Sequence, residues 1–191
     1  MHLYLYGIGQ GVLHPITQGE WEVTDFVGLR GDKVYYISTE SSPLKRDLYR
    51  VGLDGKHKER LTPGDGYYSI YPSADLSYYI CEGGDSSAPG RTDVFNAAGK
   101  RVRTLYDNAP LKEALVEAGL PVREFFTFTT ERGDELNGYM LKPLDFDPAK
   151  RYPVLLTQYC GPGSQQVAEG WGPDWEDALV THGYICLLYT S

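Results

Sequence analysis

The chain has 191 residues, which is enough for one large domain or for parts of two. Its 18 Lys and Arg against 26 Asp and Glu give a net charge of −8, and no run is rich in Lys or Arg, so nucleic-acid and anionic-membrane partners are disfavoured. Three widely spaced cysteines indicate neither a disulfide framework nor a zinc site, and we expect no metal and no cofactor. No stretch reaches the ~18 consecutive apolar residues of a transmembrane helix.

The first 106 residues repeat with a period near 45. Strand-like runs begin at Leu3, Leu48 and Val94, at spacings of 45 and 46 residues, and each is followed by a turn with Gly and a second short strand. The Asp54-Gly55 turn is the clearest hairpin signal. Four strands per period of about 45 are typical of a β-propeller blade, and the steady period favours a propeller over a β-sandwich with similar hairpins.

We therefore predict that residues 1–106 are the C-terminal part of a β-propeller. About two and a half blades are expected, and their ranges are 1–18, 19–62 and 63–106. Trp21 and Phe26, whose spacing puts them on alternate faces of a strand, are expected in the core between blades.

A short helix is predicted within residues 107–122, as a connector between domains. Asn108 is a candidate cap, Pro110 suits the first turn, and Gly119 followed by Pro121 should end the helix. Its apolar stripe comprises Leu111, Ala114, Leu115 and Ala118.

Residues 123–185 alternate strands with a helix. The run at 152–159 is apolar without alternation, which predicts a central strand covered on both faces. A helix should begin at Asp174, capped by that carboxylate, and end at Gly183 before another strand. Its expected inner face comprises Trp175, Ala178 and Leu179. The order strand, loop, helix, strand is the α/β pattern.

Several of these segments resemble the dipeptidyl peptidase IV family of the prolyl oligopeptidase superfamily. The most specific is the stretch Tyr159-Cys160-Gly161-Pro162-Gly163-Ser164-Gln165-Gln166-Val167. Trp171 ahead of Asp174-Trp175, and Ile16-Thr17-x-Gly19-x-Trp21-Glu22-Val23 in the propeller part, are also similar to the family. The resemblance implies C-terminal propeller blades followed by the N-terminal start of an α/β-hydrolase peptidase domain at 123–185.

The same resemblance implies a serine exopeptidase. Members of the family remove dipeptides from peptide N-termini, prefer Pro or Ala in second place, and act through a Ser-Asp-His triad and an acyl-enzyme. Peptides or oligopeptides are thus the expected partners, the full-length protein is a candidate homodimer, and an exported or periplasmic location is favoured by the family alone. Another prolyl-oligopeptidase-like enzyme (an acylaminoacyl peptidase or an endopeptidase) and a non-catalytic propeller-hydrolase binding protein stay open as alternatives.

Tyr159 is the candidate catalytic residue of this chain. It matches the family position whose hydroxyl helps to form the oxyanion hole, and Gly161, Pro162 and Gly163 would let the backbone turn away from it without crowding a substrate. On spacing alone, Tyr159 is one of sixteen tyrosines and would be assigned to packing. The surrounding motif favours the oxyanion role.

No triad member is expected in the chain. A G-x-S-x-G elbow is absent, since residues 84–88 fail at the last position, and the histidines fit no triad: His2, His14, His57 and His182. The family's paired substrate-binding glutamates belong to an earlier propeller segment. We therefore expect this polypeptide, taken alone, to be inactive and poorly soluble, with open sheet edges.

Residues 186–191, Cys186-Leu187-Leu188-Tyr189-Thr190-Ser191, break the resemblance abruptly. They translate the codons TGT CTC TTA TAC ACA TCT, which match a transposase end sequence used in preparing sequencing libraries. Our hypothesis is that these residues are a sequencing-adapter artefact, and that the natural sequence departs from this one after Ile185.

Overall fold

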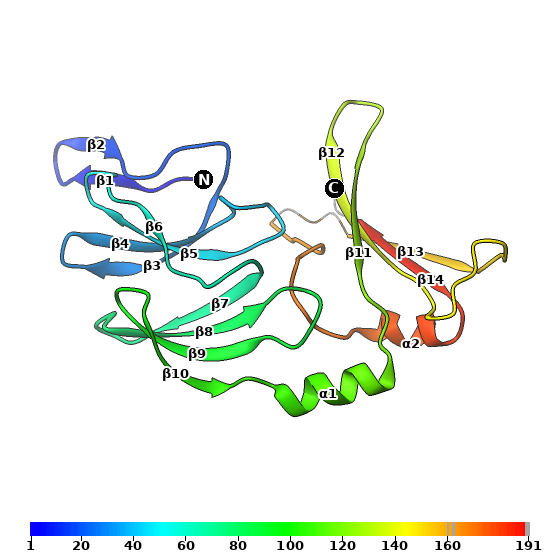
Figure 1. Cartoon of the computed structure of the whole chain (residues 1–191). Helices are drawn as coiled ribbons and strands as arrows, with labels where there is room; N and C mark the ends of the chain where they lie inside the picture. The colour runs from blue at the N-terminus through cyan, green and yellow to red at the C-terminus, as the bar shows by residue number, and fades with distance from the viewer. Residues whose placement is uncertain (160, 162, 190–191) are drawn as a thin grey trace. The chain divides into compact units, whose positions relative to one another are not determined.

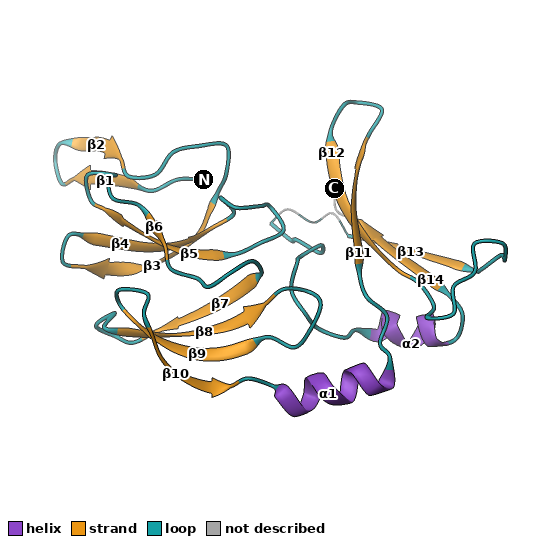
Figure 2. Cartoon of the chain, in the orientation of Figure 1, coloured by secondary structure: helices purple, strands orange, loops and turns teal. Residues whose placement is uncertain are grey.

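The computed structural model describes residues 1–159, 161 and 163–189. The chain divides into two compact units, Met1–Asp85 with Gly90–Asp107, and Ser86–Pro89 with Asn108–Ser191. Strands supply most of the regular structure in both units (Figure 1, Figure 2). Within the described residues, no helix has the length and apolar character that crossing a membrane requires.

The first unit consists of three antiparallel sheets. A two-stranded sheet pairs β1 (Tyr4–Gly7) with β2 (Gly11–Pro15). A four-stranded sheet contains β3 (Val23–Arg30), β4 (Lys33–Ser38), β5 (Asp47–Gly52) and β6 (Glu59–Arg60). The next contains β7 (Tyr67–Pro72), β8 (Tyr78–Gly84), β9 (Arg91–Asn96) and β10 (Arg101–Tyr106). In each four-stranded sheet every strand pairs with its neighbour in sequence, as in the blades of a β-propeller.

The sheet β3–β6, called the middle sheet below, places alternate side chains in two different hydrophobic cores. Val34 and Tyr36 of β4 pack in one cluster, with Ile16 and with Leu5 of β1, whereas Tyr35 between them packs in the other, against the sheet β7–β10. A strand buried on both faces needs apolar side chains at successive positions, which is why the run from Val34 to Ile37 does not alternate. Each fully buried large apolar side chain contributes roughly 1.5–3 kcal/mol.

Hydrogen bonds reinforce the contact between the two four-stranded sheets. The Tyr35 hydroxyl and the Arg50 guanidinium both donate to the Ala97 carbonyl, at 3.0 and 2.8 Å, and the Tyr79 hydroxyl donates to the Leu61 carbonyl at 3.1 Å. These bonds satisfy polar groups that burial would otherwise leave without partners.

The prediction that Trp21 and Phe26 lie in the core between blades is half right. Trp21 packs against the core cluster and stacks on Tyr36 with ring centroids 6.2 Å apart. Phe26 is 60% exposed, so its assignment to the inter-blade core is wrong for this chain. Two register shifts in the β3–β4 ladder, between Val23 and Asp25 and between Phe26 and Gly28, disturb the simple alternation on which that assignment rested.

The second unit contains a mixed four-stranded sheet and two helices. Its elements are α1 (Ala109–Ala118), β11 (Glu124–Thr129), β12 (Glu135–Leu141), β13 (Val154–Gln158), α2 (Trp175–Thr181) and β14 (Ile185–Tyr189). The strand order is β11-β12-β14-β13, with β13 and β14 parallel and the other pairs antiparallel. The connection from β13 to β14 runs through α2, as parallel pairing requires. Residues 186–189 are part of β14, and their origin as an adapter sequence stays a hypothesis.

Helix α1 begins and ends near the predicted positions, but its cap differs. Asn108 is in the left-handed region (φ 56°) and makes no side-chain cap bond, so the prediction that it caps the helix through its side chain is wrong. A left-handed residue turns the chain at this point, which draws the side chain away from the first amides. Gly119 (φ 63°) is the C-cap, as predicted, and no residue of α1 is buried.

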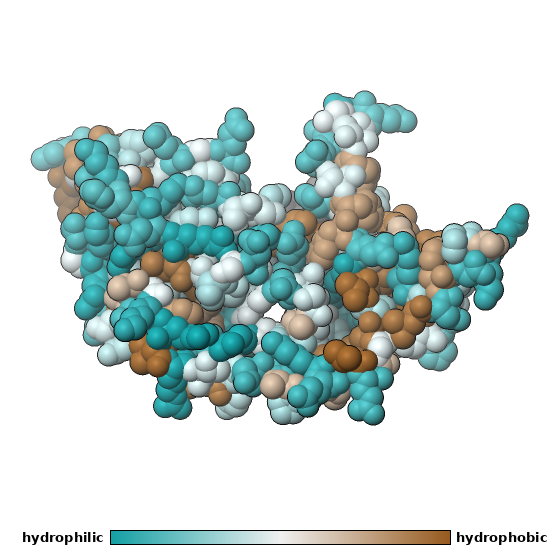
Figure 3. Space-filling view, viewed as in Figure 1, coloured by the Kyte–Doolittle hydropathy of each residue, from teal (hydrophilic) through white to brown (hydrophobic). Residues whose placement is uncertain are grey.

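Strand β13 lies at an edge of the described sheet, which contradicts the prediction of a central strand covered on both faces. Val154 is 62% and Leu156 56% exposed. Apolar side chains show at the surface over the sheet β11–β14 in the space-filling view (Figure 3). Within the described residues, β13 has a hydrogen-bonded neighbour on one side, β14, so its continuous apolar run is only partly covered.

Candidate functional site

Tyr159 immediately follows β13, at the C-terminal end of that strand. Its side chain is 57% exposed, and its hydroxyl makes no hydrogen bond within the described part of the chain. In sheets with parallel strands, binding and catalytic groups gather at the C-terminal ends of the strands. The position of Tyr159 therefore leaves a phenolic O–H available to a ligand at the edge where such sites form.

The glycines after Tyr159 serve two different purposes. A Cβ at Gly161 would lie 2.6 Å from the Tyr159 hydroxyl oxygen and 2.7 Å from Cε1, so the tyrosine ring occupies the space that a side chain would need. Gly163 is in the left-handed region (φ 72°), where nothing within 4 Å would obstruct a Cβ. The Ser164 amide donates to the Gly161 carbonyl at 3.0 Å and closes the turn. Pro162, the third predicted loop residue, lies outside the described residues.

Helix α2 is capped as predicted but presents a different face to the sheet. Asp174 and Asp177 form a reciprocal capping box, and Gly183 (φ 85°) follows the C-cap His182. The buried residues of the helix are Glu176 and Val180, whereas Trp175 is 55% exposed, so the predicted inner face is wrong by about one position. Because a carboxylate lies on the buried face of α2, that face cannot be identified from the apolar residues alone.

Glu176 is the buried charged residue of this region, at 2% exposure. Its carboxylate accepts a hydrogen bond from the Tyr139 hydroxyl at 2.7 Å and another from the Thr157 hydroxyl at 3.0 Å. Burial, followed by the hydrogen bond and the charge of Glu176, raises the pKa of Tyr139 well above its usual value. Tyr139 is therefore a hydrogen-bond donor at any physiological pH.

Sequence reasoning missed Glu176, Tyr139 and Thr157. Thr157 directly follows the apolar residues Val154, Leu155 and Leu156, and its hydroxyl is the local signal of a polar partner beneath the strand. Glu176 resembles an ordinary first-turn acidic residue, favoured there by the helix dipole whether buried or not. Its burial follows from tertiary packing that no spacing within the helix reveals.

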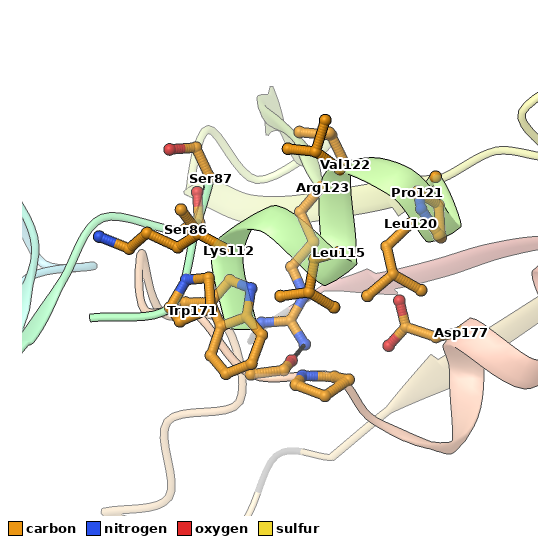
Figure 4. A pocket seen from close by; sticks show the side chains of 16 residues that line it. Ser86, Ser87, Lys112, Leu115, Leu120, Pro121, Val122, Arg123, Trp171 and Asp177 are labelled. Atoms are coloured by element: carbon orange, nitrogen blue, oxygen red, sulfur yellow. Dashed lines mark hydrogen bonds between the residues drawn. The ribbon is translucent and has the colours of Figure 1, made fainter. Parts of the chain in front are cut away.

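A pocket of about 290 Å³ lies elsewhere in the second unit (Figure 4). Trp171 and Lys112 lie at one end and Asp177 at the other. The Arg123 guanidinium, on its floor, donates to the carbonyls of Gly170 and Gly172 at 3.3 and 2.7 Å. Trp171 is among the residues that line this pocket, and Tyr159 is not.

The described residues contain no cluster of three His, Cys, Asp or Glu side chains that could hold a metal ion. The polar groups near the end of β13 are the Tyr139 phenol, the Thr157 hydroxyl and the Glu176 carboxylate, which accepts a hydrogen bond from each of the other two. Such a set can donate and orient hydrogen bonds.

Comparison with known proteins shows which family this chain is similar to. A family model described as the dipeptidyl peptidase IV (DPP IV) N-terminal region matches residues 1–89. A protein of Emericella nidulans named "Probable dipeptidyl peptidase 4" is 37% identical over 177 residues, covering 89% of this chain. The crystal structure of Porphyromonas gingivalis dipeptidyl peptidase 4 superposes with a TM-score of 0.90 at 36% identity, over 99% of this chain. The chain is dipeptidyl peptidase IV-like.

The chain is also similar to proteins that carry a second name, dipeptidyl-aminopeptidase B. A protein of Emericella nidulans named "Probable dipeptidyl-aminopeptidase B" is 35% identical over 179 residues, covering 89% of this chain. The chain spans 22% of the length of the first of these relatives, 20% of the second and 27% of the Porphyromonas gingivalis chain. Each of these proteins is therefore more than three times as long as this dipeptidyl peptidase IV-like sequence.

Proposed function

We propose that this chain is part of a longer serine peptidase that releases N-terminal dipeptides, with Pro or Ala preferred in second place. In this proposal the second unit is the start of an α/β-hydrolase domain, and the triad lies in a part of the protein that this chain does not include. The named relatives, which are dipeptidyl peptidases and a dipeptidyl-aminopeptidase, support the reaction class. The chain taken alone would then be inactive, because it supplies no nucleophile.

The observation that carries the proposal is the position of Tyr159. Acyl transfer passes through a tetrahedral intermediate with a negative oxygen, which is stabilised by donors that already point at it. In α/β-hydrolases one donor is the amide after the nucleophile, and the other comes from the loop after an early strand. Tyr159 begins such a loop, with its hydroxyl free of hydrogen bonds to the described residues.

The substrates that fit this proposal are peptides with a free N-terminus. The net charge of −8 gives no electrostatic attraction for nucleic acid, so we propose peptides or oligopeptides as the partners and a homodimer as the state of the full-length protein. The strand–helix–strand connection from β13 through α2 to β14, with parallel strands, supports the assignment of the second unit to an α/β domain.

The test is Tyr159→Phe in the full-length protein that contains this chain, assayed on an Xaa-Pro-p-nitroanilide. Losing one oxyanion donor should lower kcat by roughly 10²–10³ with little change in KM. Tyr106→Phe, at a 67% exposed tyrosine of β10 in the first unit, is the matched control and should keep wild-type turnover.

Two results would contradict the proposal in different ways. Wild-type kcat in a folded Tyr159→Phe enzyme would remove the oxyanion role while leaving the peptidase class intact. A folded full-length wild-type protein that cleaves neither Xaa-Pro nor Xaa-Ala substrates would remove the class as well. In that case acylaminoacyl and internal peptide substrates would separate the other peptidases from a non-catalytic binding protein.

A further inference from the structure

Glu176 connects two strands that are not neighbours in the sheet. Tyr139 belongs to β12 and Thr157 to β13, and these strands lie on either side of β14. The carboxylate therefore spans β14 on the face covered by α2, where the Cys186 thiol of β14 approaches the Glu176 carbonyl at 3.8 Å. The side chain of Glu176 thus joins strands β12 and β13 to helix α2.

The network is complete at each of its described ends. Each carboxylate oxygen of Glu176 accepts one hydroxyl hydrogen bond, and the ring of Tyr139 lies under the Arg123 guanidinium, 4.8 Å from the ring centroid. A buried carboxylate that lost either donor would be costly, so the arrangement has little freedom to slide. Such a network holds positions rather than moving protons.

The Thr157 end of the network is the one that bears on Tyr159. Thr157 lies two residues before Tyr159, next to the last residue of β13. Within the described residues, β14 is the one hydrogen-bonded neighbour of β13, so the side-chain bond from Thr157 to Glu176 adds a second attachment near the end of the strand. The hydrogen bond to Glu176 anchors the strand at the point where the Tyr159 loop departs.

We propose that Glu176 is a positioning residue which, through Thr157, holds the end of β13 and so fixes the Tyr159 hydroxyl for catalysis. This inference rests on the proposed function, because it assigns Glu176 a role only if Tyr159 stabilises the oxyanion. Displacement of a catalytic group by about 1 Å can cost up to 10²-fold in rate, so loss of the anchor should be visible in kcat.

The experiment uses the full-length enzyme with Thr157→Val, which keeps the shape of the side chain and removes the donor. We expect kcat on an Xaa-Pro-p-nitroanilide to fall about tenfold, with KM changed less than twofold. Thr157→Ser restores the hydroxyl and should restore most of kcat. Glu176→Gln keeps an acceptor oxygen, so its kcat should lie between the kcat of the wild type and that of Glu176→Ala.

The control separates positioning from general loss of stability. Val180→Ala removes part of a buried side chain one turn along α2 and leaves the polar network in place. It should lower Tm about as much as Thr157→Val does, while kcat stays unchanged. A double-mutant cycle then asks whether the effect passes through Tyr159. In a Tyr159→Phe background, Thr157→Val should have almost no further effect on kcat.

The outcomes distinguish this inference from the function on which it rests. If Tyr159→Phe lowers kcat but Thr157→Val does not, the positioning role is wrong and the oxyanion role stands. If Thr157→Val lowers kcat equally in both backgrounds, its effect does not run through Tyr159 and the inference is again wrong. If Tyr159→Phe itself leaves kcat unchanged, the proposed oxyanion role fails first.

Discussion

The contact between Gly161 and the ring of Tyr159 predicts an unequal response of two glycines in one loop. Gly161→Ala places a methyl group where the hydroxyl end of the ring now lies, so the ring must move. We expect at least a tenfold loss of kcat in the full-length enzyme, by the same displacement argument. Gly163→Ala strains the backbone (φ 72°) but meets no neighbour, and should cost about 1 kcal/mol of stability with a smaller effect on kcat. Equal kcat values for the two variants would contradict the assignment of the ring to this position.

Cys81 predicts a pH dependence of stability in the first unit. Burial, then the charges of Asp93 and Asp47, raises the pKa of the Cys81 thiol from 9.0 to about 12. The folded state therefore prefers the protonated thiol. Below pH 9 the thiol is protonated in the folded and the unfolded state alike, so the stability of the fold does not depend on this group. Above pH 9 the unfolded chain loses the proton while the folded one keeps it, so stability should fall as the pH rises from 9 towards 12.

Two measurements check this prediction. Denaturant unfolding at pH 8 and pH 10.5 should give a smaller loss of stability for Cys81→Ala than for the wild type. Peptide mapping after iodoacetamide treatment at pH 8.5 should find Cys81 unmodified in the native protein and alkylated after unfolding. Rapid alkylation of native Cys81 would show that the thiol is not buried as described.

At the scale of whole elements, Asp47 joins β5 to β6 and to the chain segments that flank these two strands of the middle sheet. Its carboxylate is fully buried in β5 and accepts hydrogen bonds from Ser41, from Arg60 Nε at 3.0 Å and from the Thr62 hydroxyl at 2.5 Å. Strand β6 has only two residues, so these side-chain bonds supplement a short ladder.

Asp47→Ala should therefore destabilise the sheet more than a surface substitution does. Loss of a buried carboxylate with its partners left in place costs about 3–5 kcal/mol, and the part exposure of Arg60 places the expected loss at about 2–4 kcal/mol. Asp25→Ala, at an exposed position of β3, is the control and should stay within about 0.5 kcal/mol of wild type. Chemical denaturation followed by far-UV circular dichroism measures both, and similar midpoints would refute the role of Asp47.

The sequence predicts strands better than it predicts which side of an element is buried. A period near 45 and the continuous apolar run of β4 identify the sheets of the first unit, because a strand between two cores has no polar face. The inner face of α2 could not be found, because the buried Glu176 pairs with residues 37 and 19 positions away along the chain. Phe26 could not be placed either, because ladder irregularities change the face a side chain occupies. Tyr159 was found through its motif, whereas its anchor Thr157 required the packing of the sheet.

For the whole molecule, exposed apolar strands predict how the isolated chain behaves. Val154 and Leu156 of β13 are exposed at an edge of the described sheet, a combination that favours pairing with other copies. We expect the 191-residue chain to elute in large species on size-exclusion chromatography with light scattering. Replacing Leu156 by Lys should raise the monomer fraction, since a charge on an edge strand opposes association. Leu155→Lys, at the half-buried position next to it, should disrupt the sheet and give no such gain. If the unmodified chain is instead monomeric and unfolds cooperatively, its surfaces need no covering, and the proposal that this chain is part of a longer peptidase loses this support.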